Sequence, residues 1–328
     1  MATANADFAT SLAALTFDLV EDELIDNITD NQVLLWDMDR RGYRDDRLGG
    51  LQIDYLVELG ENLSALPYAN GAILPLTTQN NQTRARYDWK FYAVPSVITG
   101  PTKFMNSGDR TQIYSLVEAI VDNAKRSLKL RVNSDLFGDG ADGISLVGLA
   151  AAVENGAAWS TYGGINSGGA SAQEQRWRNG WKGTVGSFAA NGRRKLTELI
   201  NDVTKRGEYP DLIITTQAIH QELELSMTVN EKYEMSQMKD EDMARAGFKH
   251  LVFKGIPALW DTDCTSGAAY VLNSSGLRWI VGKGKDFVDT DFQRPDNQDS
   301  MSKHTLLYCA LGTKARYREG VADGITTP

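Results

Sequence analysis

The amino-acid sequence predicts an α+β protein with a helical arm, a long β-hairpin, one long helix and a strand-rich final third. Three observations lead to this prediction. Apolar residues recur at helical spacing near the start of the chain and again around residues 113–128. Apolar and polar residues alternate on both sides of a turn-rich segment, and short apolar runs follow one another after residue 250. With 328 residues, 42% of them hydrophobic, the chain can bury a sizeable core.

The first 42 residues are expected to form the helical arm. Thr29 and Gln32 have the spacing of a capping box, so a helix should restart at Asp30, and Gly42 is suited to end it. Acidic residues lie between the apolar positions. The apolar positions that follow helical spacing are Phe8, Leu12, Leu15, Leu19, Ile25, Ile28, Leu34 and Leu35.

Two alternating segments are expected to pair as a long hairpin. The first runs from Leu51 to Leu59 and the second from Arg84 to Phe91, and each has one apolar and one polar face. The intervening segment is rich in Pro, Asn, Gly and Thr, which favour turns. Because a two-stranded hairpin is marginally stable in water, this one needs a partner surface, either on its own body or on another subunit.

The clearest helix pattern follows the hairpin. Ser107 can cap its start and Asp109 suits the positive end of its dipole, and the helix should continue to about Leu136 before a glycine-rich loop. Apolar residues at steps of three and four mark its buried face. They are Ile113, Leu116, Val117, Ile120, Ala124 and Leu128.

An α/β module and a strand-rich region are expected in the rest of the chain. Helices are predicted at 146–153, 196–205 and 218–225, and a strand at 211–216. The final third should form an antiparallel sheet. Its predicted strands are 251–253, 258–260, 269–272, 277–281, 287–292 and a long last one at 306–317.

Charge and cysteine content exclude several classes of protein. The net charge of −9 argues against a protein that grips phosphate backbones over a broad basic face. Cys264 and Cys309 are too few for a disulfide framework or a cysteine zinc site, which is typical of a cytosolic chain. No uninterrupted apolar stretch reaches the length of a membrane-spanning helix.

No motif indicates a catalytic, cofactor-binding or metal site. Residues 143–148 have the wrong spacing for a nucleophile elbow, and residues 282–286 lead into a strand and not a helix, unlike a phosphate-binding loop. The acidic loop 135–143 lacks the spacing of a calcium loop and is interpreted as a tight turn. His220, His250 and His304 have no ligand partner at metal spacing.

Trp177 and Trp181 are four residues apart among basic residues. Such a pattern could stack nucleic-acid bases. Packing of one helical face is the favoured interpretation.

Several short stretches, taken in order, resemble the major capsid proteins of tailed bacteriophages with the Hong Kong 97-type coat fold. The resemblance covers nearly the whole chain and depends on the number and order of these stretches, since none is a catalytic motif. They are Gly49-Gly50, residues 83–90, 106–108, 136–140, 147–153, 161–165, Trp177-Arg178 and 253–257 with Asp261.

The resemblance implies a domain division and a function. The expected parts are an N-terminal arm (1–42), an extended hairpin loop (43–100), a peripheral domain with a spine helix and an antiparallel sheet (101–145 and 275–328), and an axial α/β domain (146–274). It implies a structural protein, not an enzyme, that self-assembles through hexamers and pentamers into the icosahedral head of a tailed double-stranded DNA phage. It would assemble in the host bacterial cytoplasm and reside in the virion capsid.

The expected partners are further copies of the chain, a portal protein and packaged DNA held without sequence-specific contacts, with a scaffolding or decoration protein left open and no membrane. A weakly acidic inner wall would let DNA slide. Any scaffold would be a separate protein, because the arm begins at Met1. The alternatives are an encapsulin-like bacterial nanocompartment shell, which shares the fold, and a soluble α/β enzyme using Asp211, Asp261 or Asp263.

The hairpin and the arm supply the candidate subunit-interface residues. Its apolar face is expected to be buried only on assembly. Arg84 and Arg86 could pair with the acidic arm of a neighbour. The equally weighted alternative is that both arginines lie on a solvent-exposed face without such partners. Because no Lys precedes Lys90, the Lys–Asn bond that welds the shells of some family members is not expected, and the shell should be non-covalent. The candidates are Leu51, Ile53, Tyr55, Arg84, Arg86, Tyr87, Trp89, Glu21, Asp22 and Glu23.

Overall fold

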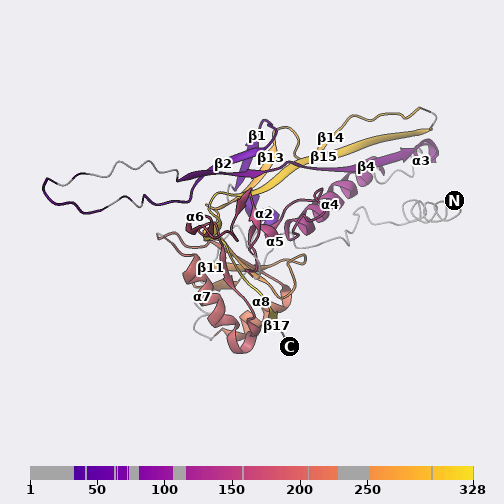
Figure 1. Ribbon diagram of the computed structural model, residues 1–328. Coiled ribbons are helices and arrows are strands. Elements are labelled where there is room, and N and C mark those ends of the chain that lie inside the picture. Colours follow the sequence, from indigo (N-terminus) through magenta and orange to yellow (C-terminus); the bar gives the residue numbers. More distant parts are fainter. Residues whose placement is uncertain are drawn as a thin grey trace. The chain divides into compact units, whose positions relative to one another are not determined.

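A computed structural model describes residues 33–40, 43–62, 64, 66–71, 73, 81–105, 116–156, 159–205, 207–227, 251–296 and 298–327 (Figure 1). The chain divides into two compact units. The first comprises residues 1–30, 92–131 and 284–307, and the second residues 31–91, 132–283 and 308–328. The helices expected before residue 33 and the start of the long helix near Ser107 lie outside the described residues.

The described part of the first unit consists of most of one long helix, a short helix and paired strands. Helix α4 (Leu116–Leu136) buries Ala124 and Leu128, as its sequence pattern predicts. It also buries Val121, which was not predicted, whereas the predicted Ile120 is only half-buried. Its C-terminal end at Leu136 agrees with the prediction. The strands of this unit are β14 (Val288–Asp289), part of β4 (Lys90–Thr99) and part of β15 (Ser300–Thr313), and the short helix is α3 (Gly100–Met105).

Asp289 ties the long helix to these strands. Its carboxylate lies 3.0 Å from Nζ of Lys125 on α4 and 3.2 Å from Nζ of Lys303 on β15, and it accepts a hydrogen bond of 2.7 Å from Oγ1 of Thr305. Burial by itself would raise the pKa of Asp289, but these hydrogen bonds outweigh it and hold the pKa below its usual value.

A six-stranded mixed sheet forms the centre of the second unit. Strand β9 lies between β11, to which it is parallel, and β12, to which it is antiparallel. Every residue of β9 and β12 is buried, as expected for strands covered on both faces. The order is β10 (Leu251–Phe253), β11 (Ile256–Trp260), β9 (Leu212–Thr215), β12 (Ala269–Leu272), β16 (Gly320–Ala322) and β7 (Gly180–Lys182).

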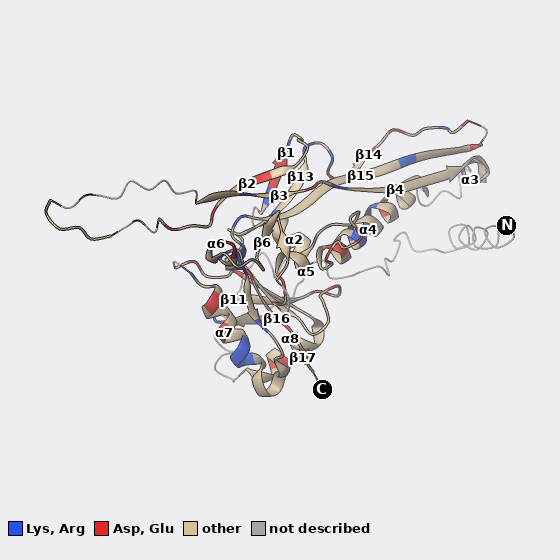
Figure 2. Ribbon diagram, in the orientation of Figure 1, with Lys and Arg blue, Asp and Glu red and all other residues tan. Residues whose placement is uncertain are grey.

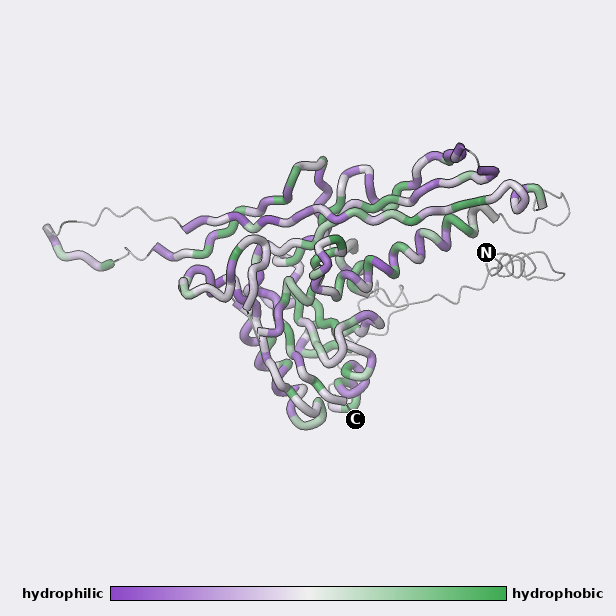
Figure 3. Tube along the Cα trace, turned by 45° about the vertical axis from the view of Figure 1, so that its right-hand side comes forward, coloured by the Kyte–Doolittle hydropathy of each residue, from purple (hydrophilic) through white to green (hydrophobic). Residues whose placement is uncertain are grey.

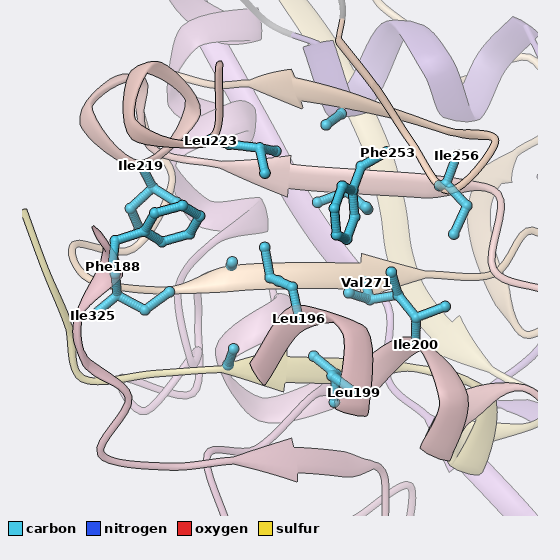
Figure 4. Close-up of a cluster of buried hydrophobic side chains, with 14 of the residues drawn as sticks. Phe188, Leu196, Leu199, Ile200, Ile219, Leu223, Phe253, Ile256, Val271 and Ile325 are labelled. Atoms are coloured by element: carbon cyan, nitrogen blue, oxygen red, sulfur yellow. The ribbon is translucent and has the colours of Figure 1, made fainter. Parts of the chain in front are cut away.

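Two helices cover one face of this sheet. Helix α7 (Arg193–Val203) contacts β16 and β7, and α8 (Gln217–Ser226) contacts β11. Their apolar faces meet the sheet in a continuous hydrophobic core, shown in Figure 4. The labelled residues of this core are Phe188, Leu196, Leu199, Ile200, Ile219, Leu223, Phe253, Ile256, Val271 and Ile325.

A second group of strands in this unit carries helix α2 (Val33–Arg40). Strand β1 (Arg44–Arg47) runs parallel to β13 (Leu277–Gly282), and β13 pairs antiparallel with the C-terminal part of β15. Charges of both signs lie side by side on β1, as Figure 2 shows, and Arg47 pairs with Asp45 at 2.9 Å.

The remaining described elements are short. The π-helix η1 (Phe188–Gly192) leads directly into α7, and the 3₁₀ turn η2 (Arg316–Arg318) connects β15 to β16. No helix among the described residues is long and apolar enough to cross a membrane. The others are α5 (Leu149–Ala152), β5 (Thr161–Tyr162), β6 (Ile165–Asn166), α6 (Ala172–Gln175), β8 (Gly186–Ser187) and β17 (Ile325–Thr326).

Two expectations about this part of the chain are wrong. The strands after residue 250 do not form one antiparallel sheet, because β10 to β12 join β9 in the mixed sheet while β13 to β15 pair separately. Trp177 and Trp181 do not share a helical face. Trp177 is buried just after α6, whereas Trp181 lies in β7 and is 37% exposed.

Candidate assembly surface

Strands β2 (Ile53–Glu58) and β3 (Gln82–Tyr87) form the predicted hairpin. They are antiparallel, with Ile53 opposite Tyr87 and Tyr55 opposite Ala85. Hydrophobic and hydrophilic residues alternate along both strands, as Figure 3 shows, so that one face is apolar. The sequence pattern therefore predicted both strands and the apolar face of the hairpin correctly. The second strand, however, ends at Tyr87, and a new strand, β4, begins at Lys90.

The apolar face of β2 and β3 is buried on the protein's own body. The Tyr87 hydroxyl donates a 2.8 Å hydrogen bond to the carbonyl oxygen of Thr313, and its ring lies 5.4 Å from that of Tyr162. The Tyr55 ring lies 4.8 Å from Nζ of Lys314. Ile53, Tyr55 and Tyr87 are consequently buried without a neighbour, and the expectation that assembly alone buries them is wrong.

Both tyrosines act as hydrogen-bond donors. Burial, together with the nearby Asp45 carboxylate, raises the pKa of Tyr55 to about 12, and burial also raises the pKa of Tyr87. Tyr55 donates to Asp45 at 2.8 Å. Burial opposes ionisation of Asp45, but hydrogen bonds from Tyr55 and Arg47 prevail and lower its pKa. The base of the hairpin is thus fixed by polar as well as apolar contacts.

Tyr55, Tyr87 and Tyr162 form a tyrosine cluster. A buried ion pair lies next to it. Arg316 is fully buried, with Nη2 3.0 Å from the Glu154 carboxylate and Nε donating to the Ala152 carbonyl oxygen at 2.7 Å. Its guanidinium lies 5.0 Å from the centre of the Tyr162 ring. Burial lowers the pKa of Arg316, while Glu154 opposes that shift. The sequence offered no sign that this arginine is buried.

The turn between β5 and β6 fastens the hairpin from the side. The Arg86 amide donates to the Gly163 carbonyl oxygen at 2.9 Å. Gly163 has a φ of +62°, and a Cβ there would lie 3.1 Å from the Tyr87 hydroxyl. Both facts favour glycine at this position, because a side chain would meet the left-handed backbone penalty and the tyrosine together.

The polar face of the hairpin is exposed. Arg84 and Arg86 lie 3.7 and 3.8 Å from the same Asp54 carboxylate, with more than half of each arginine side chain accessible. Exposed pairs of this kind contribute little to stability, so both arginines can exchange partners. Glu21, Asp22 and Glu23, the acidic residues expected to meet them, lie outside the described residues.

The two remaining candidate positions differ. Leu51 is 95% exposed. Trp89 is half-buried and donates from Nε1 to the Gly50 carbonyl oxygen at 3.1 Å. Leu51 thus remains available for an intersubunit contact, whereas the indole of Trp89 is partly used within its own chain.

Large apolar side chains are exposed on the hairpin beyond and beside the buried face. Leu66, Tyr68 and Ile73 follow β2 in the outer hairpin, and Leu56 lies on the opposite face of that strand. Sequence reasoning missed Leu66, Tyr68 and Ile73 because they occur among turn residues. The signal that could have identified them is the presence of large apolar residues in a segment too polar to form a core. The exposed set is Leu48, Leu51, Leu56, Leu66, Tyr68 and Ile73.

A cavity of about 480 Å³ lies at the base of the hairpin. Its wall includes Arg86, Asp88, Lys90, Asp139 and Glu154. These groups are engaged in local structure: Lys90 donates to the Gly143 carbonyl oxygen at 2.6 Å, and Asp139 accepts from the Ala141 amide at 3.1 Å. No group of three metal-ligating His, Cys, Asp or Glu side chains occurs within the described part of the chain.

The acidic loop after α4 forms the predicted tight turn. Asp142 accepts hydrogen bonds from the amides of Ile144 and Ser145, at 3.0 and 2.8 Å, and from the Ser145 hydroxyl. These bonds lower the pKa of Asp142. Its carboxylate thereby serves to shape the turn.

Of the three aspartates considered for an enzyme, only Asp261 and Asp263 lie together. Asp211 precedes β9, where it accepts hydrogen bonds from Tyr43 and Ser274. Asp261 follows the parallel strand β11, and it shares the Asn133 amide with Asp263. Residues at opposite ends of neighbouring parallel strands of this length are separated by roughly 15 Å. A single active site cannot include both Asp211 and Asp261.

Solved structures resemble the chain along almost its whole length. A chain of the cyanophage A-1(L) capsid aligns with a TM-score of 0.73 and 18% identity over 96% of this chain and 98% of its own. A chain of the mature capsid of bacteriophage PhiM1 aligns at 0.60 and 11%, covering 94% and 92%. This chain has the Hong Kong 97-type coat fold. The predicted fold is therefore confirmed.

The same fold occurs in a shell of another kind. A chain of the holo-SrpI encapsulin complex from Synechococcus elongatus PCC 7942 aligns with a TM-score of 0.53 and 14% identity over 96% of this chain and 95% of its own. No protein-family model matches the sequence, and no curated protein matches it either. The similarity is thus one of structure.

Proposed function

We propose that the protein is the major capsid protein of a tailed double-stranded DNA phage, a structural subunit without enzymatic activity. The observation that carries this proposal is a coat fold whose hairpin base is fixed on its own body while the outer hairpin exposes Leu66, Tyr68 and Ile73. Burying such side chains against another copy would contribute roughly 25 cal/mol for each Å² of apolar surface removed from water. Many repeated contacts then stabilise a closed shell.

The finer parts of the proposal concern partners and organisation. Subunits would form hexamers and pentamers in the host bacterial cytoplasm and enclose DNA without reading its sequence, together with a portal and, optionally, a scaffolding or decoration protein. The four-part domain division at residues 42, 100, 145 and 274 belongs to the same proposal. So do the intersubunit roles of Leu51, Arg84 and Arg86.

Assembly of two matched triple variants tests the role of the outer hairpin. The first changes Leu66, Tyr68 and Ile73 to Ser, and the second changes Leu225, Tyr209 and Ile144, which have similar residue types and exposure elsewhere in the chain. Electron microscopy and sedimentation should show particles for the wild type and the second variant, and unassembled subunits for the first. Normal particles from the first variant, or equal loss in both, would contradict the proposal.

A non-covalent shell is also proposed, because the hairpin contains no lysine before Lys90. Particles boiled in detergent should release a single monomer band on a gel. A ladder of linked species would show that a covalent bond forms through other residues.

The encapsulin-like shell is the second candidate, supported by the alignment to the encapsulin chain. Particle contents distinguish the two functions. Particles purified from their natural source should contain long double-stranded DNA if this is a phage coat, whereas a co-purifying cargo enzyme without a genome would favour the nanocompartment.

A further inference from the structure

The sequence contains four Asn–Gly pairs, beginning at Asn70, Asn155, Asn179 and Asn191. An Asn–Gly pair can undergo intramolecular deamidation. The glycine backbone nitrogen attacks the asparagine side-chain carbonyl carbon, a C–N bond forms, and ammonia leaves. Water then opens the resulting succinimide ring at either carbonyl, which gives aspartate or isoaspartate. The reaction requires a glycine N–H that is not held and an asparagine that is free to turn toward it.

The structure protects two of the four pairs. The Asn179 amide donates to the carbonyl oxygens of Glu154 and Gly180, both at 2.8 Å, and the Gly180 N–H donates to the Glu319 carbonyl oxygen at 2.8 Å. Asn191 and its glycine lie in η1, where helical backbone geometry holds the side chain away from the next nitrogen. Neither pair can react without local opening.

Asn155 is an intermediate case. Its side chain is exposed, but Gly156 packs against the Trp181 ring so closely that a Cβ at this position would overlap the indole. The Trp181 Nε1 is held in turn by Asp323 at 3.1 Å. The backbone therefore has little freedom to reach the cyclisation geometry.

The pair at Asn70 meets both requirements. Asn70 and Gly71 are exposed in a turn of the outer hairpin, and neither forms a hydrogen bond within the described part of the chain. Gly71 has a φ of +84° and nothing within 4 Å of a Cβ built on it. We infer that Asn70 is a self-modification site, at which the free subunit converts spontaneously to aspartate and isoaspartate.

The conversion changes the chemistry of the outer hairpin. It replaces a neutral amide by a carboxylate two residues after the exposed Tyr68, and the isoaspartate form adds one methylene to the main chain. A hairpin that lies across a neighbouring copy would hold this turn and slow the reaction, a step that rests on the proposed function. Modification would then mark subunits that remained unassembled.

Peptide mass spectrometry tests the site directly. Free subunits are incubated at 37 °C at two pH values above neutrality, with an Asn70→Gln variant as control. Asn70 should gain one mass unit first and faster at the higher pH, while Asn179 and Asn191 should react at least about tenfold more slowly because they must first open. Faster reaction at either protected pair would overturn the inference, as would an Asn70 that stays intact while a synthetic 66–73 peptide converts.

Assembled particles provide the second arm. A lower rate at Asn70 in particles than in free subunits would support both the site and the hairpin's contact with a neighbour. Equal rates would still support the modification site but would contradict the proposal that a neighbouring copy covers this turn. The two ideas can therefore fail separately.

Discussion

Tyr87 and Tyr68 belong to the same hairpin but lie in opposite environments. Tyr87 is 6% exposed and is fixed by Thr313 and Tyr162, whereas Tyr68 is 67% exposed. The comparison shows that one β-ribbon serves two purposes. Its base is part of the protein's own core, and its outer part presents apolar surface that a single copy of the chain leaves uncovered.

This difference limits how the hairpin can move. The base contributes to folding stability, so a change that lifts it from the body must break the Tyr87 and Tyr55 contacts together. Among the described outer residues, Glu61 forms an exposed ion pair with Arg176 at 3.4 Å, which is a weaker tie than the buried contacts of the base. Any conformational adjustment during the proposed assembly should therefore occur beyond β2 and β3 and leave the base in place.

The largest expected effect comes from the same substitution at both tyrosines. Tyr87→Ala should lower the free energy of unfolding by about 3–5 kcal/mol, because it removes a buried ring and leaves a cavity. Tyr68→Ala should change it by less than about 0.5 kcal/mol, as expected for an exposed side chain. Urea unfolding of the free subunit measures both.

Assembly should be sensitive to the exposed tyrosine even though folding is not. Tyr68→Ala should fold normally but form fewer particles. If Tyr87→Ala does not fold, Tyr87→Phe replaces it, with an expected loss of about 1 kcal/mol for the hydrogen bond to Thr313. Equal stability losses at both positions would show that the base is not anchored as described.

The sequence was sufficient to predict the strands of the hairpin, because alternation has a period of two residues and β2 and β3 follow it. It was not sufficient to predict what covers the apolar face. Tyr162 and Thr313 lie 75 and 226 residues further along the chain than Tyr87, and no local pattern links them. Sequence periodicity reports which face is apolar, whereas the covering surface depends on tertiary contacts.

The same limit explains the other errors. Residues 251–272 contain strands of the right length, but their own side chains do not specify that β11 should pair parallel with β9. Arg316 lies between Lys314 and Arg318, a composition typical of an exposed segment. Its burial follows from the 3₁₀ turn and from the position of Glu154, both of which require the folded chain.

Glu154 supports the hairpin base through the buried Arg316, whose guanidinium lies over the Tyr162 ring. Glu154→Gln removes the charge that compensates the buried Arg316, and it should cost about 2–3 kcal/mol of unfolding free energy. Glu198→Gln is the matched control. Glu198 pairs with Arg194 and Lys195 on the exposed side of α7, and its loss should produce no measurable change.

Both glutamate variants should keep the outer hairpin unchanged. Hydrogen exchange of the described outer residues, 66–71, should match the wild type, while exchange at β3 and β5 should accelerate in Glu154→Gln alone. Similar unfolding curves for the two variants would mean that the buried pair does not support the hairpin base.

The last expected effect is a dependence of stability on pH that originates at Glu319. This side chain is fully buried, and Oε2 accepts from the Asn273 amide at 2.9 Å. The turn that begins at Asn273 supports Thr313, because the Thr313 Oγ1 donates to the Gly276 carbonyl oxygen at 3.2 Å. Burial, reinforced by Asp211 and opposed by Asn273 and Arg318, raises the pKa of Glu319 well above its ordinary value.

The direction of the pH effect follows from that shift. Because the folded pKa is raised, the contribution of Glu319 to stability is fully present below the unfolded pKa of about 4.3 and is lost as the pH rises through the folded pKa. The slope cannot exceed about 1.4 kcal/mol per pH unit for one proton. Glu319→Gln keeps an acceptor for Asn273 but cannot ionise, so this part of the pH dependence should disappear.

Urea unfolding between pH 5 and pH 9 measures this difference. The wild type should lose stability relative to Glu319→Gln as the pH rises, and the exchange of amides in β3 should follow the same trend because Thr313 holds Tyr87. Residues 66–71 share no contact with this carboxyl group in the described chain. Their amide hydrogen exchange should therefore be the same in both proteins at every pH. Parallel stability curves for both proteins would exclude Glu319 as the source of pH sensitivity at the hairpin base.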